Sequence, residues 1–326
     1  MRSLLGTLEK FRSVHLLVVG DLMLDRFIWG EVERLSPEAP VPVLRVLSEN
    51  FSLGGAANVI HNVCTLGGRV TACGIIGKDD AGKRIVNALQ KVGASTAGVY
   101  TDARFQTIEK SRIIASPHHQ QIVRLDREAR QPIGQNALKK LGGFIAANAL
   151  RFDGIILSDY GKGAIHENLL ATVARAMRRG KVCVVDPKKE NYENYRLPAL
   201  LTPNKSEASE ASGISIVDEA SLNAAGKKLL RKWHAAALLI TRGAEGMSLF
   251  RPGLAVKHFP TESRDVFDVT GAGDTVVAVC ALALASGASY DDAAVLANIA
   301  AGFVGDEVGT VAVKSAKIRR AIKDSL

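Results

Sequence analysis

The chain has 326 residues, with 42 Lys and Arg against 33 Asp and Glu, a formal net charge of +9 and 47% hydrophobic residues. This mixture is typical of globular proteins and argues against disorder, and the length suits one large α/β domain or two ordinary ones. No apolar run reaches the roughly 20 residues that a membrane helix needs, so no membrane partner is expected. The amino terminus does not look like an export signal, and the four scattered cysteines predict neither disulfides nor a zinc site. We therefore expect a cytoplasmic protein.

The excess of positive charge has two interpretations. The basic residues are spread along the chain without a helix-turn-helix, zinc-finger or aromatic RNA-binding signature, so nucleic acid is not an expected partner. Attraction of a small polyanionic substrate explains the charge equally well. The histidines, including His118 and His119, have no partners at metal-ligand spacing and are interpreted as structural or surface residues.

Short apolar runs that end in a polar residue predict the buried strands of a sheet. These runs lie at 15–20, 154–157, 182–185, 200–203 and 237–240. Helical stretches at 136–150, 166–179 and 219–232 alternate with them, which predicts an α/β fold with a mostly parallel central sheet and helices on both faces. Ligands bind beyond the carboxyl ends of such strands. We therefore expect one rim to carry Asp21, Asp159, Asp186, Asn204 and Thr241.

Two stretches, 27–51 and 105–125, alternate apolar and polar residues and are typical of strands with one solvated face. Neither is long enough for a core of its own. We expect them to form a small β-sheet lid over the site, from about 24–52 and 100–126, within a single domain of residues 1–326. Two unrelated surface hairpins are the alternative. The apolar faces and open edges of such strands predict a homodimer through the lid.

The strongest motif is Asp-Val-Thr-Gly-Ala-Gly-Asp at 268–274, followed by an apolar stretch. Gly271 and Gly273 permit a tight turn whose main-chain N–H groups, with the positive end of the following helix, would bind a phosphate. Asp274, in the first turn, would take a proton from an attacking hydroxyl. Together with Ala272 these residues form the predicted catalytic set. The alternative is a plain loop with Asp274 as a helix cap.

This motif resembles the second signature of the ribokinase/PfkB family of carbohydrate kinases, and Gly-Gly-Ala-Ala-Asn at 54–58 is similar to the first. Taken alone, 54–58 would be a strand-to-helix turn. The resemblance runs from about Val18 to about Val313 and implies a ribokinase-like fold with ATP and Mg²⁺ as cofactors. It assigns Glu207, in an N-x-x-E motif, to the metal. It also implies a set of nucleotide-binding residues: Asn204, Lys205, Ser206, Glu207, Thr241, Arg242, Gly243, Gly246, Val266 and Asn298. For Arg242, pairing with Glu245 is the alternative.

Several segments narrow the resemblance within this family. Residues 20–25, 34–43, 158–163 and 241–247 closely resemble the bacterial heptose 7-phosphate kinases. These make the 1,7-bisphosphate on the way to ADP-heptose and the lipopolysaccharide inner core. The chain has no H-x-G-H motif of the adenylyltransferase that is often fused to them, so a stand-alone kinase is expected. The alternatives are a kinase for ribose, fructose or tagatose phosphate, and a module that binds nucleotide without catalysis.

A phosphorylated sugar needs cations at the far end of its pocket. Lys162, confined between two glycines, is the first candidate to hold the 7-phosphate, followed by Arg124, Lys189 and Arg104. For each of them a solvated surface charge is the alternative. The resemblance assigns the sugar hydroxyls to Asp21, Gly54, Gly55 and Asn58. Asp25 and Asp159 are expected to join them, with a turn cap as the alternative for Asp25.

Overall fold

The large sheet has nine strands in this computed structural model, which describes residues 2–116, 120–261, 271–304 and 312–324. Their bounds are β1 (His15–Gly20), β4 (Arg69–Gly77), β5 (Ser95–Asp102), β8 (Gly154–Ser158), β9 (Val182–Asp186), β10 (Leu200–Leu201), β11 (Leu238–Thr241), β12 (Met247–Phe250) and β13 (Lys257–Phe259). They lie in the order β13-β12-β11-β10-β9-β8-β1-β4-β5. All neighbours pair in parallel except β11 with β12 and β12 with β13. The prediction of a mostly parallel sheet is confirmed.

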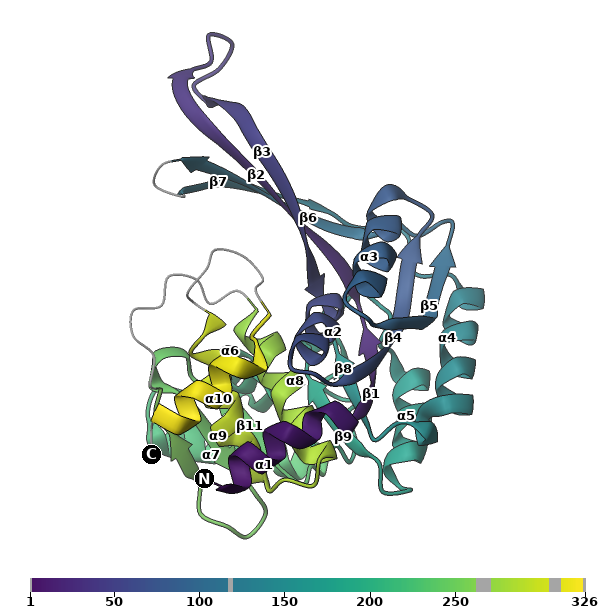
Figure 1. The fold of residues 1–326 in the computed structure, drawn as a ribbon, viewed down its shortest axis with the longest axis vertical. Helices are drawn as coiled ribbons and strands as arrows, with labels where there is room; N and C mark the ends of the chain where they lie inside the picture. The colour runs from purple at the N-terminus through teal and green to yellow at the C-terminus, as the bar shows by residue number, and fades with distance from the viewer. Residues whose placement is uncertain (1, 117–119, 262–270, 305–311, 325–326) are drawn as a thin grey trace.

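Helices cover both faces of this sheet (Figure 1). They are α1 (Arg2–Lys10), α2 (Ala56–Thr65), α3 (Asp80–Lys91), α4 (Gln135–Asn148), α5 (Glu167–Met177), α6 (Lys205–Ser212), α7 (Glu219–Trp233), α8 (Ala272–Ala285), α9 (Tyr290–Ala301) and α10 (Ser315–Asp324). Successive side chains of β1 point to opposite faces, so Leu16 and Val18 pack with α1–α3 and α8–α10, whereas Leu17 and Val19 pack with α4–α7. No helix in the described parts of the chain is long and apolar enough to cross a membrane.

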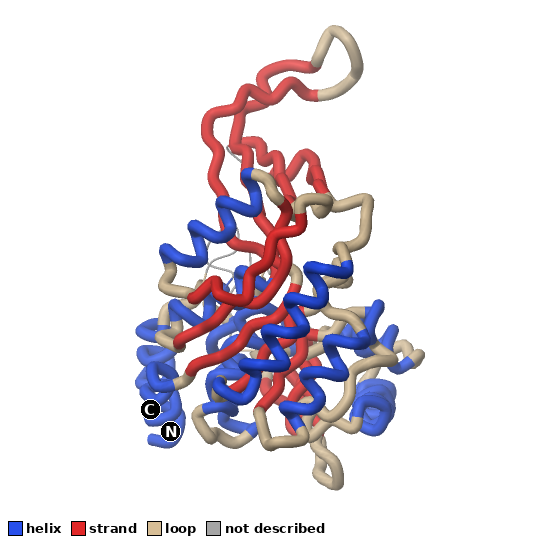
Figure 2. The backbone as a smooth tube through the Cα atoms, turned by 90° about the vertical axis from the view of Figure 1, so that its right-hand side faces the viewer, coloured by secondary structure: helices blue, strands red, loops and turns tan. Residues whose placement is uncertain are grey.

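A second, four-stranded sheet, which we call the lid, rises from this layered body (Figures 1 and 2). Its strands are β2 (Leu22–Leu35), β3 (Pro42–Gly55), β6 (Ile108–Ser116) and β7 (Gln120–Arg127). The two hairpins are joined because β2 pairs in parallel with β6, so they are one sheet and not unrelated hairpins. The expected start of the second lid segment, about residue 100, is wrong. Residues up to Asp102 belong to β5, which pairs with β4 in the large sheet, and the lid resumes at Ile108.

Candidate functional site

Helix α8 begins after Gly271, whose φ of +86° lies in the left-handed region that glycine adopts without strain. None of the described side chains caps this end, so the first N–H groups of the helix have no side-chain acceptor. A Cβ built on Gly273 would meet no described atom within 4 Å. The predicted cradle Gly271–Ala272–Gly273 therefore lies at the positive end of a helix, where an anion is stabilised, and no described atom crowds the side-chain position of Gly273.

Asp274 is the third residue of α8, and its carboxylate accepts hydrogen bonds from two other elements. Asn58 Nδ2, from α2, donates to Oδ2, and Tyr160 Oη donates to Oδ1, both at 2.7 Å. The side chain is therefore not the helix cap of the alternative interpretation. Burial raises the pKa of Asp274 to about 6, while the bonds from Tyr160 and Asn58 lower it. A carboxylate that is ionised at neutral pH yet more basic than usual suits proton abstraction.

The Gly-Gly-Ala-Ala-Asn segment is indeed a strand-to-helix turn, and this turn brings Asn58 to the site. Gly55 has a φ of +55°, and a Cβ there would lie 2.7 Å from the carbonyl oxygen of Asp21. Helix α2 starts at the next residue and places Asn58 in its first turn. Asn62 Nδ2 donates to the Asn58 carbonyl at 3.0 Å and its Oδ1 accepts from the Thr275 hydroxyl, which joins α2 to α8. The turn and the predicted site are one feature.

Asp21, at the carboxyl end of β1, organises the loop that follows β8. Its two carboxylate oxygens accept main-chain N–H bonds from Tyr160, Lys162 and Ala164 at 3.0–3.1 Å. Burial raises the pKa of Asp21, and these three donors oppose that shift. The loop carrying Lys162 is thereby fixed beside the rim.

The other two predicted sugar carboxylates are held by side chains. Asp25, on β2, accepts from the Arg112 guanidinium on β6 and is not a turn cap, and Gly54 leaves it room, because a Cβ there would lie 2.4 Å from Asp25 Oδ2. Asp159 accepts from Tyr195 Oη at 2.6 Å and Asn191 Nδ2 at 2.7 Å. Burial raises the pKa of Asp159 to about 6.

Cations gather where the lid meets the rim, and they include one that sequence reasoning missed. Lys110, on β6, lies opposite Asp25 in the pairing of β2 with β6. Its ammonium is 5.8 Å from the centre of the Tyr160 ring. Lys162 pairs with Glu128 at 2.7 Å, and Arg124 with Asp126 at 2.8 Å.

Two of the candidate cations lie elsewhere. Lys189 has a side chain 68% exposed and pairs with Glu210 of α6. Arg104 follows the end of β5 and approaches Asp102, to which its main-chain N–H donates at 3.0 Å. The structure therefore brings Lys162 and Arg124 together with Lys110, and not Lys189.

The expected nucleotide segments meet at the far side of the rim. Asn204 and Glu207 form a reciprocal capping box at the start of α6, Asn204 bridges to Thr241, and Ser206 lies in the first turn. Lys205 and Arg242 both pair with Glu245, at 3.4 and 3.1 Å, as the alternative for Arg242 foresaw.

The remaining residues that are expected to bind the nucleotide lie in the turn after β11, on α9 and at position 266. Gly243 and Gly246 have φ of +61° and +83°, and a Cβ on Gly246 would overlap the carbonyl of Phe259. Asn298 Nδ2 donates to the Pro260 carbonyl at 2.7 Å. Val266 lies outside the described residues.

Acidic side chains cluster between the residues expected to bind the sugar and those expected to bind the nucleotide. Burial raises the pKa of Asp186, at the end of β9, and the charges of Glu207 and Asp274 raise it further. Lys188 Nζ donates to Glu207 Oε1 at 2.9 Å and offsets part of this charge. The described residues hold no group of three or more His, Cys, Asp or Glu side chains arranged for a metal. The carboxylates of Asp186 and Glu207 fit Mg²⁺, because proteins commonly bind this ion through one or two carboxylates together with substrate phosphates.

Sequence reasoning missed Tyr160, Lys110 and Arg112 as site residues. Tyr160 lies between two predicted substrate-binding residues, Asp159 and Lys162, and this position was the signal in the sequence that could have identified it. Lys110 and Arg112 lie two residues apart on β6, a strand of the predicted lid, so their side chains share one face. The sequence does not indicate which face of the lid is directed toward the rim.

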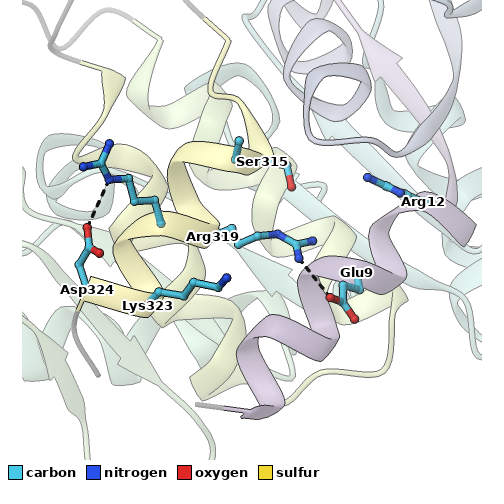
Figure 3. Close-up of a pocket in the computed structure, with 8 residues that line it drawn as sticks. Glu9, Arg12, Ser315, Arg319, Lys323 and Asp324 are labelled. Carbon is cyan, nitrogen blue, oxygen red and sulfur yellow. Dashed lines mark hydrogen bonds and ion pairs between the residues drawn. The ribbon is translucent and has the colours of Figure 1, made fainter.

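A cavity of about 810 Å³ lies away from these residues, between α1 and α10 (Figure 3). Its lining is mostly charged, and Arg319 pairs with Glu9 at 3.2 Å while Arg320 pairs with Asp324 at 3.6 Å. None of the residues that line it belongs to the candidate site, so the cavity is not part of the predicted chemistry.

A family of carbohydrate kinases and several bacterial proteins are similar to this chain in sequence. The model of the pfkB family carbohydrate kinases matches residues 14–317. The bifunctional protein HldE of Geobacter metallireducens is 49% identical over 308 residues, 94% of this chain and 62% of that protein. HldE of Pelobacter propionicus is 44% identical and is matched over 98% of this chain and 66% of its own length. The chain thus spans less than two thirds of the length of these relatives.

Solved structures share the fold at much lower identity. Arabidopsis thaliana ribokinase complexed with ribose and ATP matches with a TM-score of 0.73 and 20% identity, over 95% of this chain and 99% of that one. Escherichia coli phosphofructokinase-2 in complex with fructose-6-phosphate matches with a TM-score of 0.75 and 18% identity, over 94% and 97%. The predicted ribokinase-like fold is confirmed.

Proposed function

The chain belongs to the pfkB family of carbohydrate kinases, and on that premise we propose a specific reaction for it. It transfers the γ-phosphoryl group of ATP to the anomeric C1 hydroxyl of D-glycero-β-D-manno-heptose 7-phosphate. The product is the 1,7-bisphosphate, used for ADP-heptose and lipopolysaccharide core synthesis. The segments that resemble heptose 7-phosphate kinases support this substrate, as do the relatives named HldE.

One observation carries the preference for a phosphorylated sugar: the cations Lys110, Arg124 and Lys162 lie near one another where the lid meets the rim. Burial lowers the pKa of Lys110, two nearby carboxylates oppose this, and the positive charges of Arg124 and Lys162 lower it further. The Lys110 ammonium also lies over the ring of Tyr160, which donates to Asp274. Carboxylates already offset part of this positive charge, since Lys162 pairs with Glu128 and Arg124 with Asp126. A substrate phosphate could accept charge-assisted hydrogen bonds from the same cations, which an uncharged sugar could not.

The reaction follows from the chain's own groups. Asp274 accepts the proton of the C1 hydroxyl while that oxygen forms a bond to the γ-phosphorus and the bond from γ-phosphorus to ADP breaks. The main-chain N–H groups at Gly271–Gly273 stabilise the charge on the transferred group. The lid strands exclude water, which would otherwise compete with the sugar hydroxyl.

The nucleotide lies along Asn204, Thr241 and the turn at Gly243–Gly246, with Lys205 and Arg242 near its phosphates. Glu207 and Asp186 are the residues that would hold Mg²⁺. When bound, Mg²⁺ would supply positive charge that stabilises the nucleotide phosphates during transfer. Lys188, already paired with Glu207, adds a second positive charge on the same side.

A sugar panel with coupled detection of ADP tests the proposal. The panel contains heptose 7-phosphate, the same heptose without phosphate, ribose, fructose 6-phosphate and tagatose 6-phosphate. We expect the highest kcat/KM for heptose 7-phosphate. A preference for an unphosphorylated pentose would assign the chain to another sugar, and nucleotide binding without ADP release from any sugar would indicate a binding module.

A matched pair of variants tests the phosphate contact. Lys162→Met is expected to raise the KM for heptose 7-phosphate by about 10- to 100-fold, the value of a charge-assisted bond, and to leave the unphosphorylated heptose unaffected. Lys139→Met removes an exposed lysine of α4 and controls for net charge. Equal losses for both sugars in Lys162→Met would contradict a phosphate contact.

We also propose that two copies of the chain pair through the lid. Its strands β3 and β7 expose apolar side chains, including Val46 and Leu47 at 52% and Leu125 at 44%. A second copy would cover them. Light scattering after size-exclusion chromatography should give a dimer for the wild-type chain and a monomer for Leu47→Lys; a wild-type monomer at micromolar concentration refutes the pairing.

A further inference from the structure

Tyr160 donates hydrogen bonds to two carboxylates of the candidate site, Asp21 and Asp274. Its main-chain N–H donates to Asp21 Oδ2 at 3.0 Å, and its hydroxyl donates to Asp274 Oδ1 at 2.7 Å. The first bond fixes the backbone of residue 160 against the end of β1. The second reaches across to the first turn of α8. Because the backbone of Tyr160 is held in place, its hydroxyl has a defined position relative to the Asp274 carboxylate.

The Asp274 carboxylate is held at both of its oxygens. Asn58 Nδ2 bonds Oδ2 and the Tyr160 hydroxyl bonds Oδ1, each at 2.7 Å. Two donors on opposite oxygens fix the rotation of the carboxylate plane, which one donor leaves free. A general base must direct a lone pair at the hydroxyl it deprotonates, so this rotation matters for the reaction.

We propose that Tyr160 is a positioning residue for Asp274: its hydroxyl fixes the carboxylate so that a lone pair faces the acceptor hydroxyl of the sugar. This role rests on the proposed function, in which Asp274 is the base. The residue acts through Asp274 and transfers no proton itself. Burial and the negative charge of Asp274 raise the pKa of the Tyr160 hydroxyl well above its usual range, so it stays protonated and remains a donor.

Removing the donor has a second effect, on the ionisation of the base. Among the residues that the structure describes, the charged groups that act on Asp274 are Asp25 and Lys110 of the lid and Asp186 of β9. A Tyr160→Phe substitution leaves these in place and keeps an aromatic ring under the Lys110 ammonium. It removes only the bond to Oδ1, which favours the ionised form of Asp274. The pKa of Asp274 should therefore rise.

The test is the pH profile of kcat and kcat/KM for Tyr160→Phe with heptose 7-phosphate and ATP, from pH 5 to pH 9. The loss of one hydrogen bond to a charged group should move the acid limb upward by about one pH unit. That shift costs about fivefold in rate at pH 6, and misorientation lowers the plateau kcat by roughly three- to tenfold. The KM for ATP should change by less than about twofold. Tyr100→Phe, on β5 of the large sheet, removes the same hydroxyl elsewhere and should change neither limb nor plateau.

Two further variants separate the outcomes. Tyr160 replaced by 3-fluorotyrosine keeps a stronger donor, so the limb should move to lower pH; this test remains available if the Phe variant does not fold. An unmoved limb in either variant, or a uniform loss of activity with a normal limb, overturns the positioning role. Asp274→Asn tests the base separately: if that variant keeps near-normal turnover, the proposed function loses its base, whatever Tyr160 does.

Discussion

The ionised Asp274 should destabilise the fold, and replacing it should reveal by how much. Its side chain is 4% exposed, and burial raises its pKa from 3.8 to about 6. Asp274→Asn mimics the protonated form. The amide can accept from Asn58 through its oxygen and donate to the Tyr160 oxygen through its nitrogen, so both contacts survive. We therefore expect a variant that is inactive and more stable than the wild type at neutral pH.

The magnitude follows from the two pKa values. Below pH 3.8 the group is protonated in the folded and the unfolded chain, and it costs nothing. Between pH 3.8 and about 6 the unfolded chain ionises this group while the folded chain keeps its proton, so the wild type loses stability relative to the variant, and the loss levels off above about pH 6. The difference amounts to about 1.5 kcal/mol at pH 5 and about 3 kcal/mol at pH 8. The stability of Asp274→Asn relative to wild type should thus increase with pH.

Urea denaturation of both chains at pH 5, 6, 7 and 8 measures this trend. Asp80→Asn is the control, because the Asp80 side chain is 89% exposed and loses little solvation on folding. Its stability relative to wild type should change by less than about 0.5 kcal/mol over the same range. A difference for Asp274→Asn that is constant with pH, or that shrinks as the pH rises, would refute the reasoning that burial sets the pKa of this carboxyl.

Three further predictions concern activity and local packing. Asp274→Asn should lower kcat by about 10²–10⁴-fold in steady-state assays, and wild-type kcat/KM should fall below pH 6, where the base becomes protonated. Gly54→Ala should raise the KM for the sugar and lower the free energy of unfolding by about 1–3 kcal/mol in urea denaturation, because its Cβ would lie 2.4 Å from Asp25 Oδ2. The control is Gly143→Ala, in α4, whose Cβ would meet no described atom within 4 Å and which should stabilise the fold by about 0.5–1 kcal/mol. Chelation of divalent cations should abolish turnover, and Glu207→Gln should raise the Mg²⁺ concentration for half-maximal rate by about 10- to 100-fold in a titration; an unchanged requirement would remove Glu207 from the metal.

The sequence alone predicted the features that depend on local pattern. The runs of Val, Ile and Leu located β1, β8, β9 and β11 within one or two residues, because strands buried on both faces admit little else. The two glycines and Asp274 marked the start of α8 for a similar local reason. What local pattern cannot supply is the partner across a gap in the chain. The bond from Tyr160 to Asp274 spans 114 residues, and that from Asn58 spans 216.

The lid shows the same limit in its boundaries. Alternation of apolar and polar residues over 27–51 and 105–125 located its strands, but it did not set where the second lid segment begins, and the expected bounds placed part of β5 in the lid together with β6. Only the pairing partner distinguishes them: β5 pairs with β4 in the large sheet, and β6 pairs with β2 in the lid. Lys162 and Lys189 both lie beside rim strands, and the glycines on either side of Lys162 made it the first candidate for the substrate phosphate. The side chains differ in direction, and Lys189 pairs with Glu210 on the outside.

The lid and the base are coupled by charge, and the coupling favours the expected substrate. Asp25 and Lys110 lie opposite each other on β2 and β6, and they act on Asp274 in opposite senses: Asp25 raises its pKa and Lys110 lowers it. A phosphate bound at Lys110 would neutralise the positive member of this pair and leave the effect of Asp25. The carboxylate would then become a stronger base when a phosphorylated sugar is bound. An uncharged sugar would leave Lys110 unneutralised and Asp274 a weaker base, so the cations that we propose to bind the substrate phosphate would also favour turnover of the phosphorylated sugar.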